Sequence, residues 1–277
     1  MKTQVKLELR KIRDLGDNIS DTFHFIRMHS GSLIRNYFAI CGIFILIVAV
    51  GAALMGHDFS RLINFYSLTG LPPTGSNFLV KVIFFGVVPG WFGLVAVGVM
   101  VNSYMLCYDS QPGIPRVSAV WKVFRKFYFR VLLSSLPVSI LILAGTIFCI
   151  VPGIYLSVVL TNYICITVIE DVSLGTMFNR CFTLIRTSLW SSLAIYLIIY
   201  LIAALVELIP FGILAVTMLV LSSRDHPVIA GLMLSALSFF RLMFYVIPMI
   251  SVSLNYFTLT ERVDGLGLIR RKLQAGN

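Results

Sequence analysis

The sequence predicts an all-α integral membrane protein with six transmembrane helices, and its composition is the first reason. Of its 277 residues, 58% are hydrophobic and 12% are charged, whereas an average soluble domain has about 25% charged residues. The mean hydropathy is +0.92. Too few polar residues remain to cover a globule in water, and a disordered chain requires the opposite composition. The spacing of the apolar segments and the distribution of basic residues are the two other reasons.

Six segments are apolar enough to cross the hydrocarbon core of a bilayer, which takes about 20 helical residues. They form a membrane domain over 37–259, between a cytoplasmic tail with an amphipathic interfacial helix (1–36) and a second cytoplasmic tail (260–277). The predicted spans are 37–56, 82–108, 131–151, 154–169, 189–209 and 234–259.

The fifth apolar run, 189–221, is too long for one straight span, because a helix of that length would extend about 50 Å. Pro210 is the expected break, since proline removes a backbone donor and clashes with the preceding turn. Residues 211–221 are then a kinked extension, a re-entrant piece or an interfacial piece.

Basic residues indicate the orientation of the chain. With six spans, 18 of the 22 Lys and Arg residues fall in segments on one face and three fall in loops on the other, while Arg241 lies inside a span. Lys and Arg concentrate in short cytoplasmic loops, so both termini are expected to be cytoplasmic. The first apolar run follows 36 mostly polar residues and is too long for the core of a signal peptide, so we expect an uncleaved anchor.

Amphipathic segments precede the first, third and fifth spans. Apolar residues recur at three- and four-residue steps over 12–33, 120–131 and 174–189, which is typical of helices that lie in the membrane interface. The chain is therefore predicted to contain three repeats of an interfacial helix plus two spans. A linker helix packed on the bundle is the alternative interpretation.

The second of these segments carries four basic residues that are expected to contact anionic lipid headgroups: Lys122, Arg125, Lys126 and Arg130. Each such charge contributes about 1 kcal/mol at an anionic membrane surface. Membrane lipids are therefore the expected partner, and nucleic acid is not, because the adjacent span explains the basic residues more simply. A protein partner or a homo-oligomer is left open.

Short motifs resemble a bacterial membrane-protein family that includes the membrane domain attached to some glycerophosphodiester phosphodiesterases. The residues that carry the resemblance are Val151-Pro152-Gly153-Ile154-Tyr155-Leu156, Glu170, the amphipathic stretch 174–186, the opening 14–23 and the ending 256–262. The family often has Ser where this chain has Cys181. The resemblance implies a multi-pass protein of the bacterial cytoplasmic (inner) membrane. No phosphodiesterase domain is recognised in the sequence, so the enzymatic activity is not carried over.

The motifs of common membrane enzymes are missing from the sequence. The histidines lie outside the predicted spans, and the chain has neither an HExxH zinc motif nor a phosphate-binding GxxxxGK[ST] loop. We therefore expect a protein that is not an enzyme, with no catalytic residues, no cofactor and no metal site; the exception is a membrane enzyme with no recognisable motif.

Two ionisable residues lie within apolar runs, Glu207 and Arg241. A charge at mid-bilayer costs about 2.5–3.5 kcal/mol even on lenient scales, which makes such residues candidates for function. One hypothesis is an ion pair, or two side chains that reach the interface, locking the fifth and sixth spans together. The other is a substrate or proton site.

Asn102, Asn162 and Asn255 are the candidate polar groups inside spans. Each needs a hydrogen-bond partner in hydrocarbon, so the simplest interpretation is that they join helices. A polar cavity open to the cytoplasm is the alternative.

As a whole, the sequence favours a non-enzymatic protein with a scaffold, regulatory or membrane-organising role near lipids. The alternative is a transporter or binder of lipid-like, amphiphilic molecules.

Overall fold

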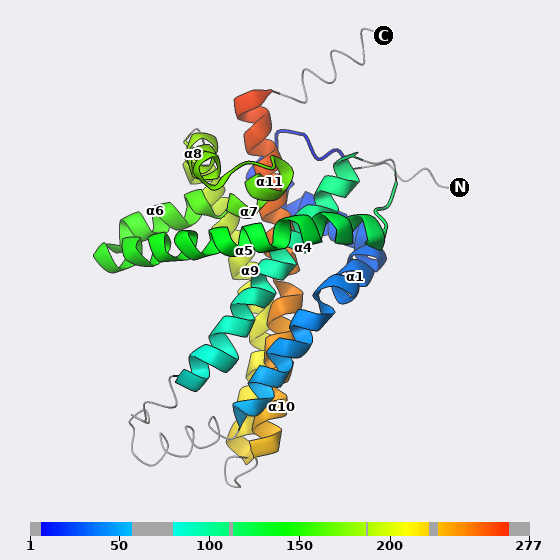
Figure 1. Cartoon of the computed structure of the whole chain (residues 1–277), viewed down its shortest axis with the longest axis vertical. Helices are drawn as coiled ribbons and strands as arrows, with labels where there is room; N and C mark the ends of the chain where they lie inside the picture. Colours follow the sequence, from blue (N-terminus) through cyan, green and yellow to red (C-terminus); the bar gives the residue numbers. More distant parts are fainter. Residues whose placement is uncertain (1–6, 57–79, 111–112, 187, 222–226, 266–277) are drawn as a thin grey trace. The chain divides into compact units, whose positions relative to one another are not determined.

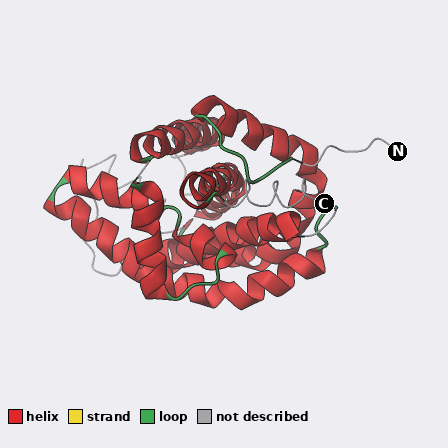
Figure 2. Cartoon of the chain, turned by 90° about the horizontal axis from the view of Figure 1, so that it is seen from above, coloured by secondary structure: helices red, strands yellow, loops and turns green. Residues whose placement is uncertain are grey.

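The computed structural model describes residues 7–56, 80–110, 113–186, 188–221 and 227–265, and every regular element in these ranges is a helix (Figure 2). Six helical stretches within them are long and apolar enough to cross a membrane, which confirms the predicted fold class. The elements (Figure 1) are α1 (Leu15–Leu54), the π-helix η1 (Val82–Val87), α4 (Val88–Ser110), α5 (Val117–Phe148), α6 (Ile150–Leu160), α7 (Tyr163–Ile169), α8 (Leu174–Ile185), α9 (Leu189–Leu221), α10 (Pro227–Phe244) and α11 (Val246–Asp264).

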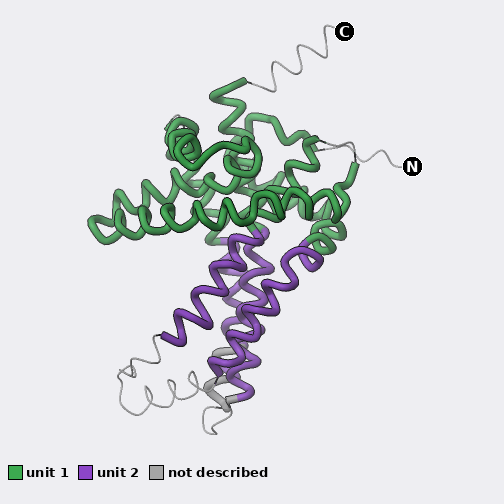
Figure 3. The backbone as a smooth tube through the Cα atoms, in the orientation of Figure 1, with its two compact units in different colours: residues 1–36, 98–201, 247–277 green, residues 37–97, 202–246 purple. Residues whose placement is uncertain are grey.

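The chain divides into two compact units, which Figure 3 shows in two colours. Unit 1 comprises residues 1–36, 98–201 and 247–277, and unit 2 comprises 37–97 and 202–246. Helices α1, α4 and α9 each contribute residues to both units.

In unit 1, α5 and α6 form a tight antiparallel hairpin that turns at Cys149, whose backbone is extended. The close packing depends on two glycines. A Cβ on Gly153 would lie 2.7 Å from the Cα of Thr146, and a Cβ on Gly145 would lie 2.8 Å from a methyl group of Leu156. Small residues let membrane helices approach this closely, which explains the glycine of Val151-Pro152-Gly153 near the start of α6.

Unit 2 is also packed at glycines. A Cβ on Gly51 in α1 would lie 2.4 Å from the carbonyl oxygen of Phe85 in η1, and one on Gly231 in α10 would lie 2.6 Å from the carbonyl oxygen of Ala53. Next to the second contact, the Ser235 hydroxyl donates a hydrogen bond to the Ala49 carbonyl (2.7 Å). Helix α10 thus lies directly against the backbone of α1 within this unit.

The helix break near Pro248 was not predicted, and the break predicted at Pro210 does not end a helix. Helix α9 continues through Pro210 to Leu221, so residues 211–221 extend the same helix, which fits the first of the three alternatives, an extension of the span. Ending a helix within an apolar run would free several backbone groups, whereas an internal proline frees the one carbonyl that loses its donor. The predicted span 234–259 is instead interrupted at Tyr245, three residues before Pro248. There the proline ring crowds the carbonyl of Phe244, four residues earlier.

The predicted repeat of an interfacial helix plus two spans is not regular in the structure. Helices α1 and α5 each join the amphipathic segment and the following span into one helix, so only α8 is a separate helix. The fourth predicted span, 154–169, is divided into α6 and α7 at residues 161–162.

Candidate functional site

Helix α11 is the centre of unit 1, and its side chains are buried from Pro248 to Glu261 without a gap. This stretch mixes apolar residues with Ser, Asn and Thr, so polar groups on several sides of the helix are removed from solvent. Such groups are costly unless they are hydrogen-bonded. The partners of α11 therefore decide how unit 1 is assembled.

The first partners of α11 lie on α1 and α4. The Ser251 hydroxyl donates to Oδ1 of Asn18 in α1 (2.7 Å). Two residues further, the Ser253 hydroxyl donates to Oδ1 of Asn102 in α4 (3.1 Å), whose amide nitrogen donates to the Gly98 carbonyl (2.9 Å). The structure thus places Asn102, one of the predicted residues, in a helix-to-helix contact.

The other two predicted asparagines lie in one hydrogen-bonded chain. Nδ2 of Asn255 donates to the Ser192 hydroxyl (3.1 Å) and to the Tyr196 hydroxyl (2.9 Å), both on α9. Tyr196 in turn donates to Oδ1 of Asn162 (3.0 Å), in the turn between α6 and α7. Tyr196 thus connects the two asparagines, and it was not among the residues predicted from the sequence. Nδ2 of Asn162 is buried and has no partner in the described part of the chain.

A cluster of charges joins α8 to the end of α11. Nε of Arg180 donates to both oxygens of Glu170 (3.1 Å each), and the other end of the guanidinium group binds Asp264. The Tyr256 hydroxyl also donates to Glu170 (2.8 Å). The hydrogen bond to Asp264, followed by that to Glu170, raises the pKa of Arg180, so this cation is permanent at all ordinary pH values.

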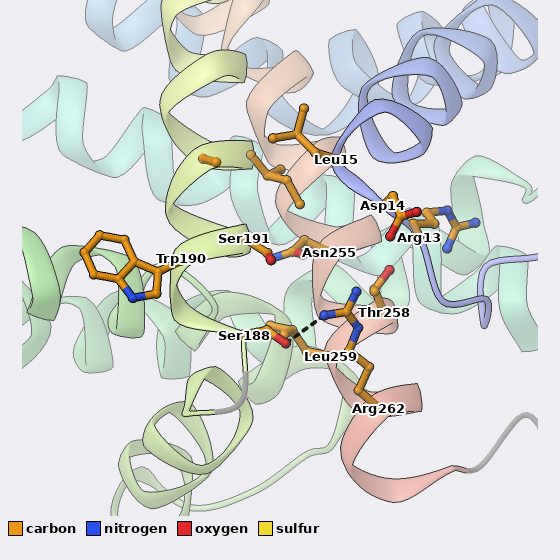
Figure 4. A pocket seen from close by; sticks show the side chains of 12 residues that line it. Arg13, Asp14, Leu15, Ser188, Trp190, Ser191, Asn255, Thr258, Leu259 and Arg262 are labelled. Atoms are coloured by element: carbon orange, nitrogen blue, oxygen red, sulfur yellow. Dashed lines mark hydrogen bonds between the residues drawn. The ribbon is translucent and has the colours of Figure 1, made fainter.

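A pocket of about 330 Å³ opens beside the ends of α9 and α11, in unit 1 (Figure 4). It combines charged, hydroxyl and amide groups with apolar side chains. The lining residues are Arg13, Asp14, Leu15, Ser188, Trp190, Ser191, Ala194, Ile195, Asn255, Thr258, Leu259 and Arg262. Asn255 therefore belongs both to the buried hydrogen-bonded chain and to the wall of the pocket.

The two arginines of the pocket have different surroundings. The side chain of Arg13 is 1% exposed, pairs with Asp21 (2.8 Å) and donates to backbone carbonyls in 8–11, so it holds the segment before α1 in place. Arg262 is exposed and donates to the Ser188 hydroxyl (2.9 Å). Arg262 is thus the basic group that can still bind a ligand.

Two of the four basic residues expected to contact lipid are paired. Lys126 and Arg130 each bind a carboxylate oxygen of Asp171 at 2.6 Å, and Arg130 also donates to the Val172 carbonyl. The hydrogen bond from Lys126 is the main cause of the lowered pKa of Asp171, and Arg130 adds to it. Lys122 and Arg125 are exposed on the same helix, α5.

Glu207 lies on α9 and Arg241 on α10, both in unit 2. Arg241 is close enough to attract Glu207 electrostatically. Among the described residues, however, the two do not form an ion pair. Glu207 is partly exposed and Arg241 is exposed, so neither is enclosed as a tightly coupled buried pair would be.

In the ranges that the structure describes, no three His, Cys, Asp or Glu side chains cluster as metal ligands would. The chain matches no family model, no curated protein and no solved structure. The helical architecture and the six apolar helical stretches define the class to which it belongs, a multi-pass membrane protein.

Proposed function

We propose that this is a non-enzymatic protein of the bacterial inner membrane with a scaffold, regulatory or membrane-organising role near lipids. The observation that carries the proposal is the central position of α11. Its buried polar side chains bind α1, α4 and α9, and its Tyr256 binds Glu170. These groups serve to join helices, which is what a rigid membrane framework requires.

The exterior of the α5–α6 hairpin supports a role next to lipid. Phe148 is 89% exposed, and large apolar side chains on both sides of the hairpin turn are exposed as well. Acyl chains are the natural cover for such a surface. Lys122 and Arg125, near the other end of α5, would contact anionic headgroups.

Reconstitution tests this proposal directly. Purified protein in vesicles of phosphatidylethanolamine and phosphatidylglycerol should change lipid order, measured by a polarity-sensitive membrane dye. The lipid composition, followed by mass spectrometry, should stay constant with time. Time-dependent formation of a lipid product would show that the protein is an enzyme, and unchanged lipid order would contradict the organising role.

The proposed orientation has both termini in the cytoplasm. Its support is the distribution of basic residues, 18 on one face and three on the other. Reporter fusions after residue 277 check it: a fluorescent protein that folds in the cytoplasm should be bright there, and a periplasmic phosphatase should be inactive. The reverse pair of results would overturn the orientation.

A second function, a binder or transporter of lipid-like molecules, is favoured by the pocket beside α9 and α11. Its volume of about 330 Å³ is within the range of pockets that hold small ligands, about 300–1,000 Å³. Charged and apolar side chains line the same space, as an amphiphile requires. Lipids retained during mild purification, and lost when Arg262 is replaced, would support this function.

A further inference from the structure

The pocket in unit 1 contains an acid and a base that are not paired with each other. Figure 4 shows Asp14 at the start of α1 and Arg262 at the end of α11 facing the same space. Within the described ranges, Arg262 donates one hydrogen bond, to Ser188, and its guanidinium group has five donors. For the Asp14 carboxylate, the described part of the chain supplies neither an ion pair nor a hydrogen-bond donor.

Neutral groups complete the polar part of the pocket. Asn255 uses its amide nitrogen for Ser192 and Tyr196, which leaves its carbonyl oxygen as an acceptor. Thr258 also borders the space (Figure 4). Leu15 and Leu259 provide apolar walls. A ligand with a charged end and a short apolar part would therefore be complementary to this space.

The position of the pocket in the chain indicates that it lies at the level of the lipid headgroups. Trp190, on its rim, is 78% exposed, and exposed Trp side chains concentrate at the boundary between hydrocarbon and water. The pocket also lies where α9 begins and α11 ends, next to segments of the chain rich in polar residues. Lipid headgroups are therefore the nearest source of a ligand.

We propose that the pocket binds a zwitterionic group that carries both a phosphate and a primary ammonium, as in a phosphoethanolamine headgroup. The phosphate binds Arg262 and the Ser188 hydroxyl, and the ammonium binds the Asp14 carboxylate. The assignment rests on the second function proposed above, the binding of lipid-like molecules.

Other headgroup classes satisfy the pocket less well. A purely anionic headgroup would bind Arg262 but would be repelled by Asp14. A purely cationic group would bind Asp14 and be repelled by Arg262. A neutral sugar would leave both charges without a counter-charge, although charge-assisted hydrogen bonds are the strong ones. Only a ligand with both charges uses both residues.

Native mass spectrometry of the full-length protein tests the assignment. The protein is released from nanodiscs that contain equal amounts of phosphatidylethanolamine and phosphatidylglycerol, and the bound lipids are counted. The wild type should retain phosphatidylethanolamine in about tenfold excess, because one charge-assisted contact is worth about one tenfold step in affinity.

Two variants separate the two charges. Arg262→Gln should reduce the retention of both lipids, because it removes the phosphate contact. Asp14→Asn should keep phosphate binding but abolish the preference for phosphatidylethanolamine. Arg186→Gln and Asp17→Asn are matched controls, because these exposed charges do not line the pocket, and they should behave like the wild type. Melting temperatures of all four variants verify folding.

The outcomes distinguish the assignment from the function on which it rests. If Arg262→Gln removes bound lipid but Asp14→Asn leaves the lipid preference unchanged, lipid binding stands and the zwitterionic assignment is wrong. If no variant changes retention, both are wrong. Competition by free phosphoethanolamine in the aqueous buffer would show that a soluble ligand with the same chemistry is the source, and its failure to compete would identify the lipid.

Discussion

The contacts of α11 in unit 1 and those of α1 in unit 2 solve the same problem, the association of apolar helices, in different ways, although the α5–α6 hairpin of unit 1 also packs at glycines. In unit 1, side-chain hydrogen bonds converge on α11 from the asparagines Asn18 and Asn102 and from Tyr196. In unit 2, glycines bring backbones into contact, as at Gly51 and Gly231. In lipid, the hydrophobic effect does not drive helices together. Interhelical hydrogen bonds and close packing of backbones are two interactions that can hold them together instead. The contacts of α11 should therefore be sensitive to changes in polarity, and the contacts of α1 in unit 2 to changes in volume.

The largest effect is expected for a change of volume in unit 2. Gly51→Ala would place its Cβ 2.4 Å from the Phe85 carbonyl oxygen, a backbone atom that cannot move aside. We expect a loss of about 3 kcal/mol in the free energy of unfolding, the upper end for overpacking. Steric trapping in detergent micelles measures it.

The matched control lies on the same helix. Nothing lies within 4 Å of the Cβ position of Gly42, so Gly42→Ala should stabilise α1 by about 0.5 kcal/mol through helix propensity. Equal losses for the two variants would show that close packing at Gly51 does not hold unit 2 together.

The next effect concerns charge in unit 1. Arg180→Met keeps an unbranched apolar stem in place of the arginine's methylene groups but leaves Glu170 and Asp264 without their shared cation. Because these side chains are about one-fifth to one-quarter exposed, we expect a loss of about 2 kcal/mol rather than the larger cost of a fully buried pair. Arg186→Met, at an exposed arginine six residues further along the chain, should cost nothing measurable in the same unfolding assay.

A smaller effect is expected for the hydrogen-bonded chain on α11. A double-mutant cycle of Asn255→Ala and Tyr196→Phe isolates the bond between them (2.9 Å). The coupling energy should be about 1 kcal/mol, within the range measured for hydrogen bonds between membrane helices. Additive losses would mean that the two side chains do not cooperate, and the role of α11 as the centre of unit 1 would lose its main support.

Glu207 and Arg241 test whether unit 2 depends on a polar contact as well as on close packing. Because they attract each other without forming an ion pair, a cycle of Glu207→Gln and Arg241→Gln should give a coupling energy of about 0.5 kcal/mol or less, as for exposed pairs. A coupling several times larger would show that unit 2 depends on a polar lock as unit 1 does.

The smallest effect lies outside the core of unit 1, at Asp171. Lys126 and Arg130 lower its pKa in the folded protein. The contribution to stability is therefore present above the unfolded pKa, about 3.9, and is lost as the pH falls through the lower folded value. Asp171→Asn should cost about 0.3 kcal/mol at pH 7, and the difference from the wild type should vanish in acid.

The choice of Asn at this position keeps the test specific. Asp171 has a positive φ of 51°, a conformation that Asn also tolerates, so the backbone is not perturbed. A difference between the wild type and Asp171→Asn that stayed constant from pH 7 to pH 3 would rule out the two ion pairs as its cause.

Apolar length and composition were sufficient to predict an all-helical protein with six helices able to span a membrane, because the hydrocarbon thickness leaves few other solutions. The same reasoning drew attention to Asn102, Asn162 and Asn255, since an amide in an apolar run needs a partner. It could not identify those partners. Tyr196 and Ser253 resemble many other residues in these helices, and Asn18 lies in a segment expected to be a cytoplasmic interfacial helix.

The partners, the pocket and the positions of the helix breaks depend on how each helix is rotated about its axis and which neighbour it meets. Helical periodicity defines which residues share a face, but it does not say which other face lies opposite. Asp14 and Arg262 are almost at opposite ends of the chain, and they border one pocket because α1 begins near the point where α11 ends. Pro210 and Pro248 likewise differ in effect although the same covalent ring is present in both: α9 continues through Pro210, whereas the helix is interrupted three residues before Pro248.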